Sequence, residues 1–286
     1  MGSLQDVDDG LRRAALSRKL RAPVLKPPPG YRRQVKSPGS CAAIWLSEDG
    51  KSVLKAPLSF YLDGCDTAAT KEYATLEQES IELIEREKLI YRHLGHHQSI
   101  LHSLRLSELG LTFPHMKNGN LRDILRKNAP RPTALTLQWI LTILEGFDYI
   151  HSLQVFQGDV SARNVLVADD LSVVLSDFSG SRIGEKSCLV RPETRYEIQT
   201  MQPFEVARRS DIFAIGSLIY EIIEGRPPYD ELEEDEVVKR FQQAKFPSTA
   251  HMILGEVIKG CWAGGYDTVK QALEDVLMRR GQILDD

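Results

Sequence analysis

The sequence is poor in the features that mark several classes of protein. It has only four cysteines, scattered and without metal-ligand spacing, so we expect reduced thiols and an intracellular protein, cytoplasmic or nuclear. No run approaches the roughly 18 apolar residues of a membrane span, and the polar first ten residues do not resemble a signal peptide. A net charge of −4 gives no reason to expect a nucleic-acid partner.

What is present fits a globular protein. The chain has 286 residues, of which 42% are hydrophobic and 27% charged, which is enough for one large domain or two small ones. Residues 11–36 carry many Lys and Arg residues and the run Pro27 to Pro29. We expect residues 1–30 to form a flexible basic arm, although a strand laid on the following domain fits the same residues.

The rest of the chain divides into a strand-rich part and a helix-rich part. Residues 42–55 predict a hairpin around an Asp-Gly turn, residues 68–95 a helix, and residues 100–114 short strands. Beyond Gly119 the pattern is mostly helical, with a nearly all-apolar helix at 212–223 that we expect to be central. The pattern predicts an α+β protein of two lobes, residues 31–116 and 117–286, with a cleft between them.

Two acids and an amide carry the strongest chemical signal. Asp159 and Asn164 lie in the run Gln157 to Asn164, and Asp177 follows a predicted hairpin. Phosphoryl transfer uses one carboxylate to orient the attacking hydroxyl, and a second carboxylate with an amide oxygen to hold Mg²⁺. Each residue alone is better explained as a turn or loop residue, but all three at these spacings favour the chemistry.

These motifs resemble those of the eukaryotic protein kinase family. That family carries His-Arg-Asp-x-x-x-x-Asn and Asp-Phe-Gly, where this chain has Gln-Gly-Asp-x-x-x-x-Asn and Asp-Phe-Ser. The resemblance covers roughly residues 31–280 and implies a bilobal kinase fold. It also implies ATP and Mg²⁺ as cofactors and a protein as substrate, with no nucleic-acid or membrane partner, and we expect a monomer.

The resemblance implies the roles of five charged or polar residues. Asp159 would be the catalytic base, and Asn164 and Asp177 would hold Mg²⁺. Val53-Leu54-Lys55 is similar to the strand whose Lys contacts the phosphates. Its expected partner is Glu87, which lies on the apolar stripe of the predicted helix and therefore needs a counter-charge. The alternative is a solvated Glu87 at a surface helix edge.

Arg163 completes the catalytic set, because it lies four residues after Asp159 as in the tyrosine-kinase form Ala-Ala-Arg-Asn. The run Phe113 to Leu121 is similar to the kinase hinge, which implies that Phe113 is the gatekeeper. The Pro114 carbonyl and the Met116 N–H would then meet the adenine edge. The nucleotide pocket implied by the resemblance contains Gly39, Ile44, Val53, Lys55, Phe113, Pro114, Met116 and Leu166.

Two further segments resemble the family's later motifs. Pro203-Phe204-Glu205 stands where the family has Ala-Pro-Glu, and Asp211 opens the predicted helix that follows. In the family that Asp braces the catalytic loop. The family's Arg that pairs with the Glu of Ala-Pro-Glu has no clear counterpart here, so we expect Glu205 to lack that salt bridge.

The chain departs from the family at several positions. The glycine-rich loop retains only Gly39, Gln157 replaces a His, and Ser179 replaces the Gly of Asp-Phe-Gly. These changes remove no metal ligand, base or phosphate Lys, so we expect an active enzyme. A nucleotide-binding or scaffolding pseudokinase remains an alternative, as does a small-molecule phosphotransferase with a His-Gly-Asp motif. Specificity for Ser/Thr or for Tyr is open.

Gly158 stands where most kinases have an Arg before the catalytic Asp. That Arg is neutralised by a phosphate on the activation segment, the residues between Asp177 and Glu205. Glycine binds no phosphate, so we predict that phosphorylation of this segment is not needed for activity. The acceptors in the segment include Thr194, Tyr196 and Thr200.

Overall fold

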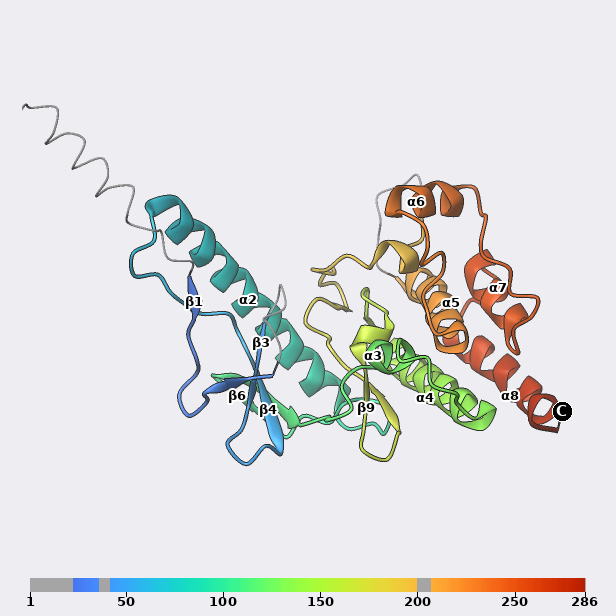
Figure 1. Ribbon diagram of the computed structural model, residues 1–286, viewed down its shortest axis with the longest axis horizontal. Helices are drawn as coiled ribbons and strands as arrows, with labels where there is room; N and C mark the ends of the chain where they lie inside the picture. Colours follow the sequence, from blue (N-terminus) through green and yellow to red (C-terminus); the bar gives the residue numbers. More distant parts are fainter. Residues whose placement is uncertain (1–22, 36–41, 200–206, 286) are drawn as a thin grey trace, which may run out of the picture.

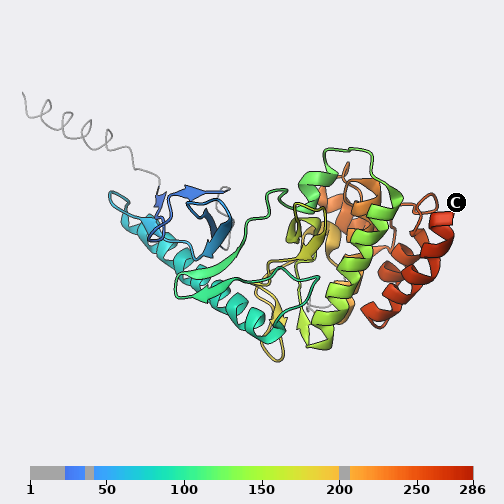
Figure 2. The ribbon, with the colours of Figure 1, turned by 90° about the horizontal axis from the view of Figure 1, so that it is seen from below.

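The protein has an α+β fold of two parts, as expected from the sequence. The computed structural model describes residues 23–35, 42–199 and 207–285. Figure 1 shows the strand-rich N-terminal part and the long helix α2 on one side and the helices α3 to α8 on the other. The turned view keeps the two parts side by side along the long axis, with the C-terminus at the end farthest from the sheet (Figure 2).

The N-terminal part is built on a five-stranded antiparallel sheet in the order β2-β3-β4-β7-β6. Its β3–β4 hairpin turns at Asp49 and Gly50, as expected. Gly50 adopts φ 70°, a conformation that glycine adopts at little cost, and the Asp49 carboxylate accepts a hydrogen bond from the Lys51 N–H. The strands are β2 (Arg33–Gln34), β3 (Ala43–Leu46), β4 (Ser52–Ala56), β6 (Arg105–Ser107) and β7 (Gly110–Pro114).

Helix α2 (Thr67–Leu94) accompanies this sheet. It begins where the Asp66 carboxylate accepts a hydrogen bond from the Ala69 N–H, and it ends at Gly95 with φ 63°. Its buried stripe contains Ile84, Glu87 and Ile90, so a carboxylate sits among apolar neighbours, as the sequence predicted.

Part of the expected N-terminal arm lies on the sheet region. Strand β1 (Val24–Leu25) pairs antiparallel with β5 (Phe60–Tyr61). Leu25 packs beside a small core that includes Trp45 and Leu54. Residues 24–25 form a strand because both side chains are apolar and β5 offers an edge for backbone pairing. Residues 1–22 lie outside the described residues.

The C-terminal part is centred on α5 (Arg208–Glu224), which is buried along nearly its whole length. This agrees with the all-apolar pattern at 212–223. Among the described residues, no helix is apolar over the length needed to cross a membrane. The other helices are α3 (Leu121–Leu125), α4 (Thr133–Ser152), α6 (Glu234–Gln242), α7 (Gly255–Ala263) and α8 (Val269–Asp285).

Short elements between α4 and α5 carry the polar motifs. The predicted hairpin is present as β9 (Val165–Val167) and β10 (Val173–Leu175). Leu101 N–H donates to the Leu175 carbonyl, so this hairpin lies at the junction with the N-terminal part. The remaining elements are β8 (Val155–Phe156), β11 (Arg182–Ile183) and the short helices η1 (Ala162–Asn164) and η2 (Thr194–Tyr196).

Candidate active site

A buried lysine meets two carboxylates between the two parts. Lys55 Nζ, on β4, lies 2.7 Å from Glu87 Oε2 on α2 and 2.7 Å from Asp177 Oδ1, which follows β10. The lysine and Glu87 side chains are 8% and 1% exposed. The pairing of Lys55 with Glu87 that the sequence predicted is therefore present, whereas Glu85 is exposed and pairs with Lys88.

The three charges shift one another's pKa. Burial lowers the pKa of Lys55, but Asp177 and Glu87 together outweigh it, so the pKa is raised and the cation persists. Burial raises the pKa of Glu87, and Lys55 only partly opposes it. Burial also raises the pKa of Asp177, but the Lys55 cation and the hydrogen bonds from Lys55 and Ser179 together outweigh it, so this pKa is lowered.

Two residues near Asp177 differ from those of the family, and both have hydrogen-bond partners. Ser179 Oγ donates to Asp177 Oδ1 at 2.7 Å, the same oxygen that Lys55 contacts. The buried Gln157 amide, which was expected to need a partner, donates from Nε2 to the Ser176 carbonyl at 2.9 Å. Asp177 itself adopts φ 59°, an uncommon conformation for a residue with a Cβ.

Asp159 and Asn164 lie together in the loop before β9. Asn164 Nδ2 donates to the Asp159 carbonyl at 2.7 Å and to Asp159 Oδ2 at 3.0 Å. Burial raises the pKa of Asp159, and the hydrogen bond from Asn164 opposes this only in part. The loop therefore places a carboxylate that accepts protons more readily than an ordinary Asp near the Lys55 group.

Asp211, at the start of α5, binds the backbone of this loop. Its carboxylate accepts hydrogen bonds from the backbone N–H groups of Gln157, at 2.8 Å, and Gly158, at 3.0 Å. It also lies 2.9 Å from His151 Nε2. Gly158 has φ 74°, so the residue that replaces the family's Arg adopts a conformation that costs glycine little. The bracing by Asp211 that the resemblance implied is present.

A cluster of charges beside this loop was missed by the sequence analysis. Arg122 on α3 is bound in bidentate fashion by Glu221 of α5, with Nε 2.8 Å from Oε1. The Tyr196 hydroxyl contacts both side chains. The available signal was Glu221 itself, a charged residue inside an almost all-apolar helix, because a buried carboxylate requires a counter-charge.

Arg163 belongs to the same region. Its side chain is 57% exposed, and its NH2 lies 2.8 Å from Oε1 of Glu193 in the activation segment. Arg163 therefore belongs to the same loop as Asp159 but forms its ion pair with an acid of the activation segment.

The residues predicted for the nucleotide pocket surround the same junction. Ile44 pairs with Lys55 and Val53 with Phe113 across the sheet, while Leu166 bridges to Asn120. Phe113 is buried against the ring of Tyr91, with ring centroids 5.2 Å apart. Ile44, Val53, Pro114, Met116 and Leu166 are half-buried. Gly39 and the Pro203-Phe204-Glu205 segment lie outside the described residues.

The donor set suits Mg²⁺ held jointly with phosphates. Asp177 Oδ2 and Asn164 Oδ1 have no hydrogen-bond partner among the described residues, because the contacts of these side chains use Asp177 Oδ1 and Asn164 Nδ2. Mg²⁺ prefers oxygen ligands and commonly takes one or two from protein and the rest from phosphate and water. The described part of the chain contains no cluster of three His, Cys, Asp or Glu residues suited to a metal, so a self-sufficient protein cage is not found there.

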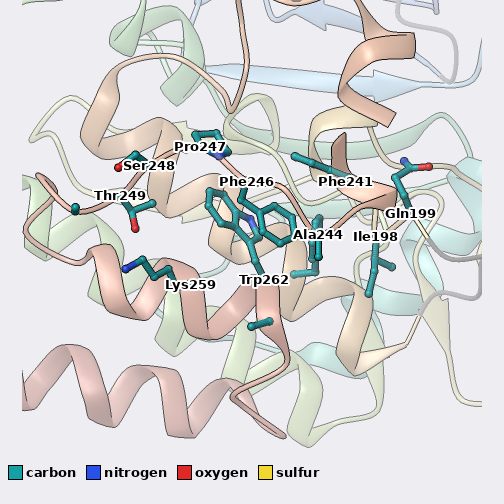
Figure 3. Close-up of a pocket in the computed structure, with 13 residues that line it drawn as sticks. Ile198, Gln199, Phe241, Ala244, Phe246, Pro247, Ser248, Thr249, Lys259 and Trp262 are labelled. Carbon is teal, nitrogen blue, oxygen red and sulfur yellow. The ribbon is translucent and has the colours of Figure 1, made fainter. Parts of the chain in front are cut away.

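A cavity of about 780 Å³ lies elsewhere, in the C-terminal part. Its walls include Phe241, Phe246 and Trp262, and the stacked rings of Phe246 and Trp262 lie together in Figure 3. It is lined by none of the acids, amides or lysines described above. The candidate active site is therefore placed at the junction, where the titratable groups converge.

Comparison with known proteins identifies the family. Residues 63–268 match the model of the family described as protein tyrosine and serine/threonine kinase. A protein of Dictyostelium discoideum named as a probable inactive serine/threonine-protein kinase is 30% identical over 179 residues, covering 53% of this chain and 15% of that protein. A second Dictyostelium discoideum protein, named as a probable serine/threonine-protein kinase, is 26% identical over 171 residues, covering 55% and 34%.

The megakaryocyte-associated tyrosine-protein kinase of Mus musculus is 27% identical over 169 residues, covering 54% of this chain and 32% of that protein. The matched region thus makes up 34% or less of each of these three relatives. The family match spans most of this chain, including the loop of Asp159 and the segment of Asp177. The chain therefore belongs to the protein tyrosine and serine/threonine kinase family.

Proposed function

We propose that this chain is an active protein kinase that uses Mg²⁺ and ATP to phosphorylate a hydroxyl group of a protein substrate. One observation carries the proposal. Lys55, Glu87 and Asp177 come from three separate elements and form one buried ionic group, next to the loop in which Asn164 binds Asp159. A group of this composition supplies a phosphate-binding cation, metal-binding oxygens and a base.

Each residue of the group has a separate task in this proposal. Lys55 binds the nucleotide phosphates, and Glu87 holds the lysine in place. Asp177 and Asn164 would hold Mg²⁺, which when bound neutralises charge on the phosphates. Asp159 orients the acceptor hydroxyl and takes its proton, a task favoured by its raised pKa. Arg163 orders the neighbouring segment through Glu193.

The nucleotide would lie between residues 31–116 and 117–286, which we propose as the two lobes. Its adenine would lie among Ile44, Val53 and Leu166, and its edge would meet the backbone of Pro114 and Met116. Phe113 would close the inner end. The half-burial of these apolar side chains supports this location, since apolar surface left at a junction is available to a planar ring.

A pseudokinase is the second candidate. Lys55 and Ser179 both donate to Asp177 Oδ1. These two protein contacts already use one of the two carboxylate oxygens of Asp177. The relative named as a probable inactive serine/threonine-protein kinase also favours this reading. The intact set of Lys55, Asp159, Asn164 and Asp177 opposes it.

The acceptor class stays a proposal as well. Ser161 stands where serine/threonine kinases usually carry a Lys, and Arg163 follows the tyrosine-kinase form, so the loop favours tyrosine. A small-molecule alcohol is the less favoured acceptor. The segments that begin at Ser210 and at Gly225 are similar to those of protein kinases.

One assay tests the proposal. Purified protein is given labelled ATP, Mg²⁺ and a degenerate peptide library, and a parallel reaction contains small alcohols. The proposal predicts Mg²⁺-dependent label on peptides, read as phosphoserine, phosphothreonine or phosphotyrosine. A protein that is thermally stabilised by Mg-ATP but labels no acceptor is a pseudokinase, and label on alcohols alone would identify a small-molecule phosphotransferase.

A further inference from the structure

The carboxylate of Glu193 is held by two arginines from different elements. Arg122 NH1, on α3, donates to Glu193 Oε1 at 2.9 Å and to Oε2 at 2.8 Å. Arg163 NH2, from the loop of Asp159, lies 2.8 Å from Oε1. An acid of the activation segment is thus bound to the catalytic loop and to the helical part at once.

The two contacts differ in strength. Arg163 is 57% exposed, and an exposed ion pair stabilises a fold only slightly. Arg122 is 5% exposed and is also bound to the fully buried Glu221. Arg122 contacts Glu193 through one nitrogen, NH1, and a charge-assisted contact to a buried arginine is short and weakly screened. The contact with Arg122 is therefore the stronger of the two.

The cluster is already neutral. Two guanidinium groups face two carboxylates, Glu193 and Glu221, and the Tyr196 hydroxyl lies between Arg122 and Glu221. No cation of this cluster is left without an anion. A phosphate group here would have to displace Glu193 from its arginines rather than neutralise an unpaired charge.

The acceptor Tyr196 points the same way. Tyr196 is 1% exposed, and a phosphate on it would place about two negative charges beside Glu221. Its modification therefore requires the cluster to open. Gly158, in place of the Arg that would bind such a phosphate, supplies no charge at the catalytic loop.

We propose that Glu193 is a permanent anion that takes the place of an activating phosphate and holds residues 190–199 against α3 through Arg122 and against the catalytic loop through Arg163. Its effect on turnover rests on the proposed kinase function, while its effect on the order of the segment does not. The test therefore uses one readout of each kind.

The first readout is hydrogen exchange of the full-length, phosphatase-treated protein. Glu193→Gln keeps the shape of the side chain but removes the charge. Glu185→Gln is the matched control, because Glu185 is an exposed acid of the same segment. Loss of a charge-assisted contact should raise exchange of amides in residues 190–199 roughly 10-fold or more in Glu193→Gln, with no change in Glu185→Gln.

The second readout is steady-state kinetics with peptide and Mg-ATP. Glu193→Gln should lower kcat by roughly 10- to 100-fold and leave the KM for ATP within a few-fold, and Glu193→Asp should restore part of the loss. In an Arg163→Met background the Glu193→Gln change should cost only slightly less, because Arg163 is the weaker of the two partners of Glu193 and Arg122 remains.

Two results would overturn the proposal. Equal exchange and equal kcat in Glu193→Gln and Glu185→Gln would show that the charge of Glu193 is not used. A fall of more than about 10-fold in wild-type kcat after phosphatase treatment would show that a phosphate supplies the anion. If the wild type transfers no phosphate while Glu193→Gln still raises exchange at 190–199, the ordering role stands and the kinase proposal fails.

Discussion

At the scale of single residues, the account depends on one lysine in contact with two carboxylates whose pKa values are shifted in opposite directions. Lys55 contacts Glu87 and Asp177 at 2.7 Å each, yet the pKa of Glu87 is raised and that of Asp177 lowered. Burial raises both pKa values, but Asp177 also accepts hydrogen bonds from Ser179, which together with Lys55 outweigh burial, whereas the charge of Asp177 raises the pKa of Glu87 further. Asp177 is thus the more acidic carboxylate of the two.

Replacing Lys55 should make Mg²⁺ binding more sensitive to acid. In Lys55→Met the cation that lowers the pKa of Asp177 is gone, so this pKa rises and protons compete with Mg²⁺ at a higher pH than in the wild type. The measurement is Mg²⁺-dependent ATP binding as a function of pH. Lys51→Met, an exposed lysine in the adjoining hairpin turn, is the control. An unchanged pH profile in Lys55→Met would refute the coupling of Lys55 to Asp177.

Replacing Glu87 should lower kcat/KM for ATP, but by less than replacing Lys55. Glu87→Gln leaves Lys55 its contact with Asp177 and removes a buried charge. The lysine can still bind phosphate, but its side chain is held less firmly in place. We expect kcat/KM for ATP to fall by roughly 10-fold, and by more in Lys55→Met. Glu85→Gln, an exposed acid two positions earlier on α2, should behave like the wild type. A larger loss in Glu87→Gln than in Lys55→Met would contradict this order.

At the scale of elements, the catalytic loop has its shape because Asp211 binds two successive backbone N–H groups and because Gly158 accepts a positive φ. A residue with a Cβ is strained in this conformation by about 1–2 kcal/mol. Gly158→Ala should therefore lower the free energy of unfolding by about that amount, measured by urea denaturation.

The control for this prediction is the same substitution on α8. Gly281 is exposed, and a Cβ there meets no atom within 4 Å. In a helix, Ala is favoured over Gly by roughly 0.5–1 kcal/mol, so Gly281→Ala should stabilise the protein. The conformation assigned to Gly158 would be wrong if both substitutions changed stability in the same direction.

The elements also show what the sequence could predict. The β3–β4 hairpin, α2 and the buried α5 followed from turn residues and apolar periodicity, which are local signals. The pairing of Lys55 with a Glu of α2 was implied by the family resemblance, and the apolar stripe selected Glu87. The bond between Arg122 and Glu221 joins residues 99 positions apart, and β1 forms only because β5 offers an edge. Local patterns offered a buried acid on α5 and left a strand open for the N-terminal arm, but the partners of both depend on the packed fold and could not be read from them.

At the scale of the whole molecule, the candidate site lies where the two parts meet. Lys55 and Glu87 come from the N-terminal part, and Asp159, Asn164 and Asp177 from the C-terminal part. A ligand that touches both groups should stabilise the folded chain. Binding at about 100 times the dissociation constant contributes about 2.7 kcal/mol, so Mg-ATP should raise the Tm by several degrees.

This stabilisation should depend on the metal ligand. In Asp177→Asn the rise in Tm produced by Mg-ATP should shrink toward that of metal-free ATP, because the carboxylate no longer helps to hold Mg²⁺. Asp170→Asn, an exposed acid in the turn between β9 and β10, should keep the full rise. An equal Mg²⁺-dependent rise in the wild type and Asp177→Asn would exclude Asp177 as a ligand.

The most direct test of the central claim, that Asp159 is the base of a phosphotransferase built on this fold, is the turnover of Asp159→Asn with labelled ATP and a peptide library. The substitution keeps the shape of the side chain and leaves Lys55, Glu87 and Asp177 in place. The account predicts that phosphate transfer is lost while Mg-ATP binding stays within a few-fold of the wild type. Wild-type turnover in Asp159→Asn would contradict it.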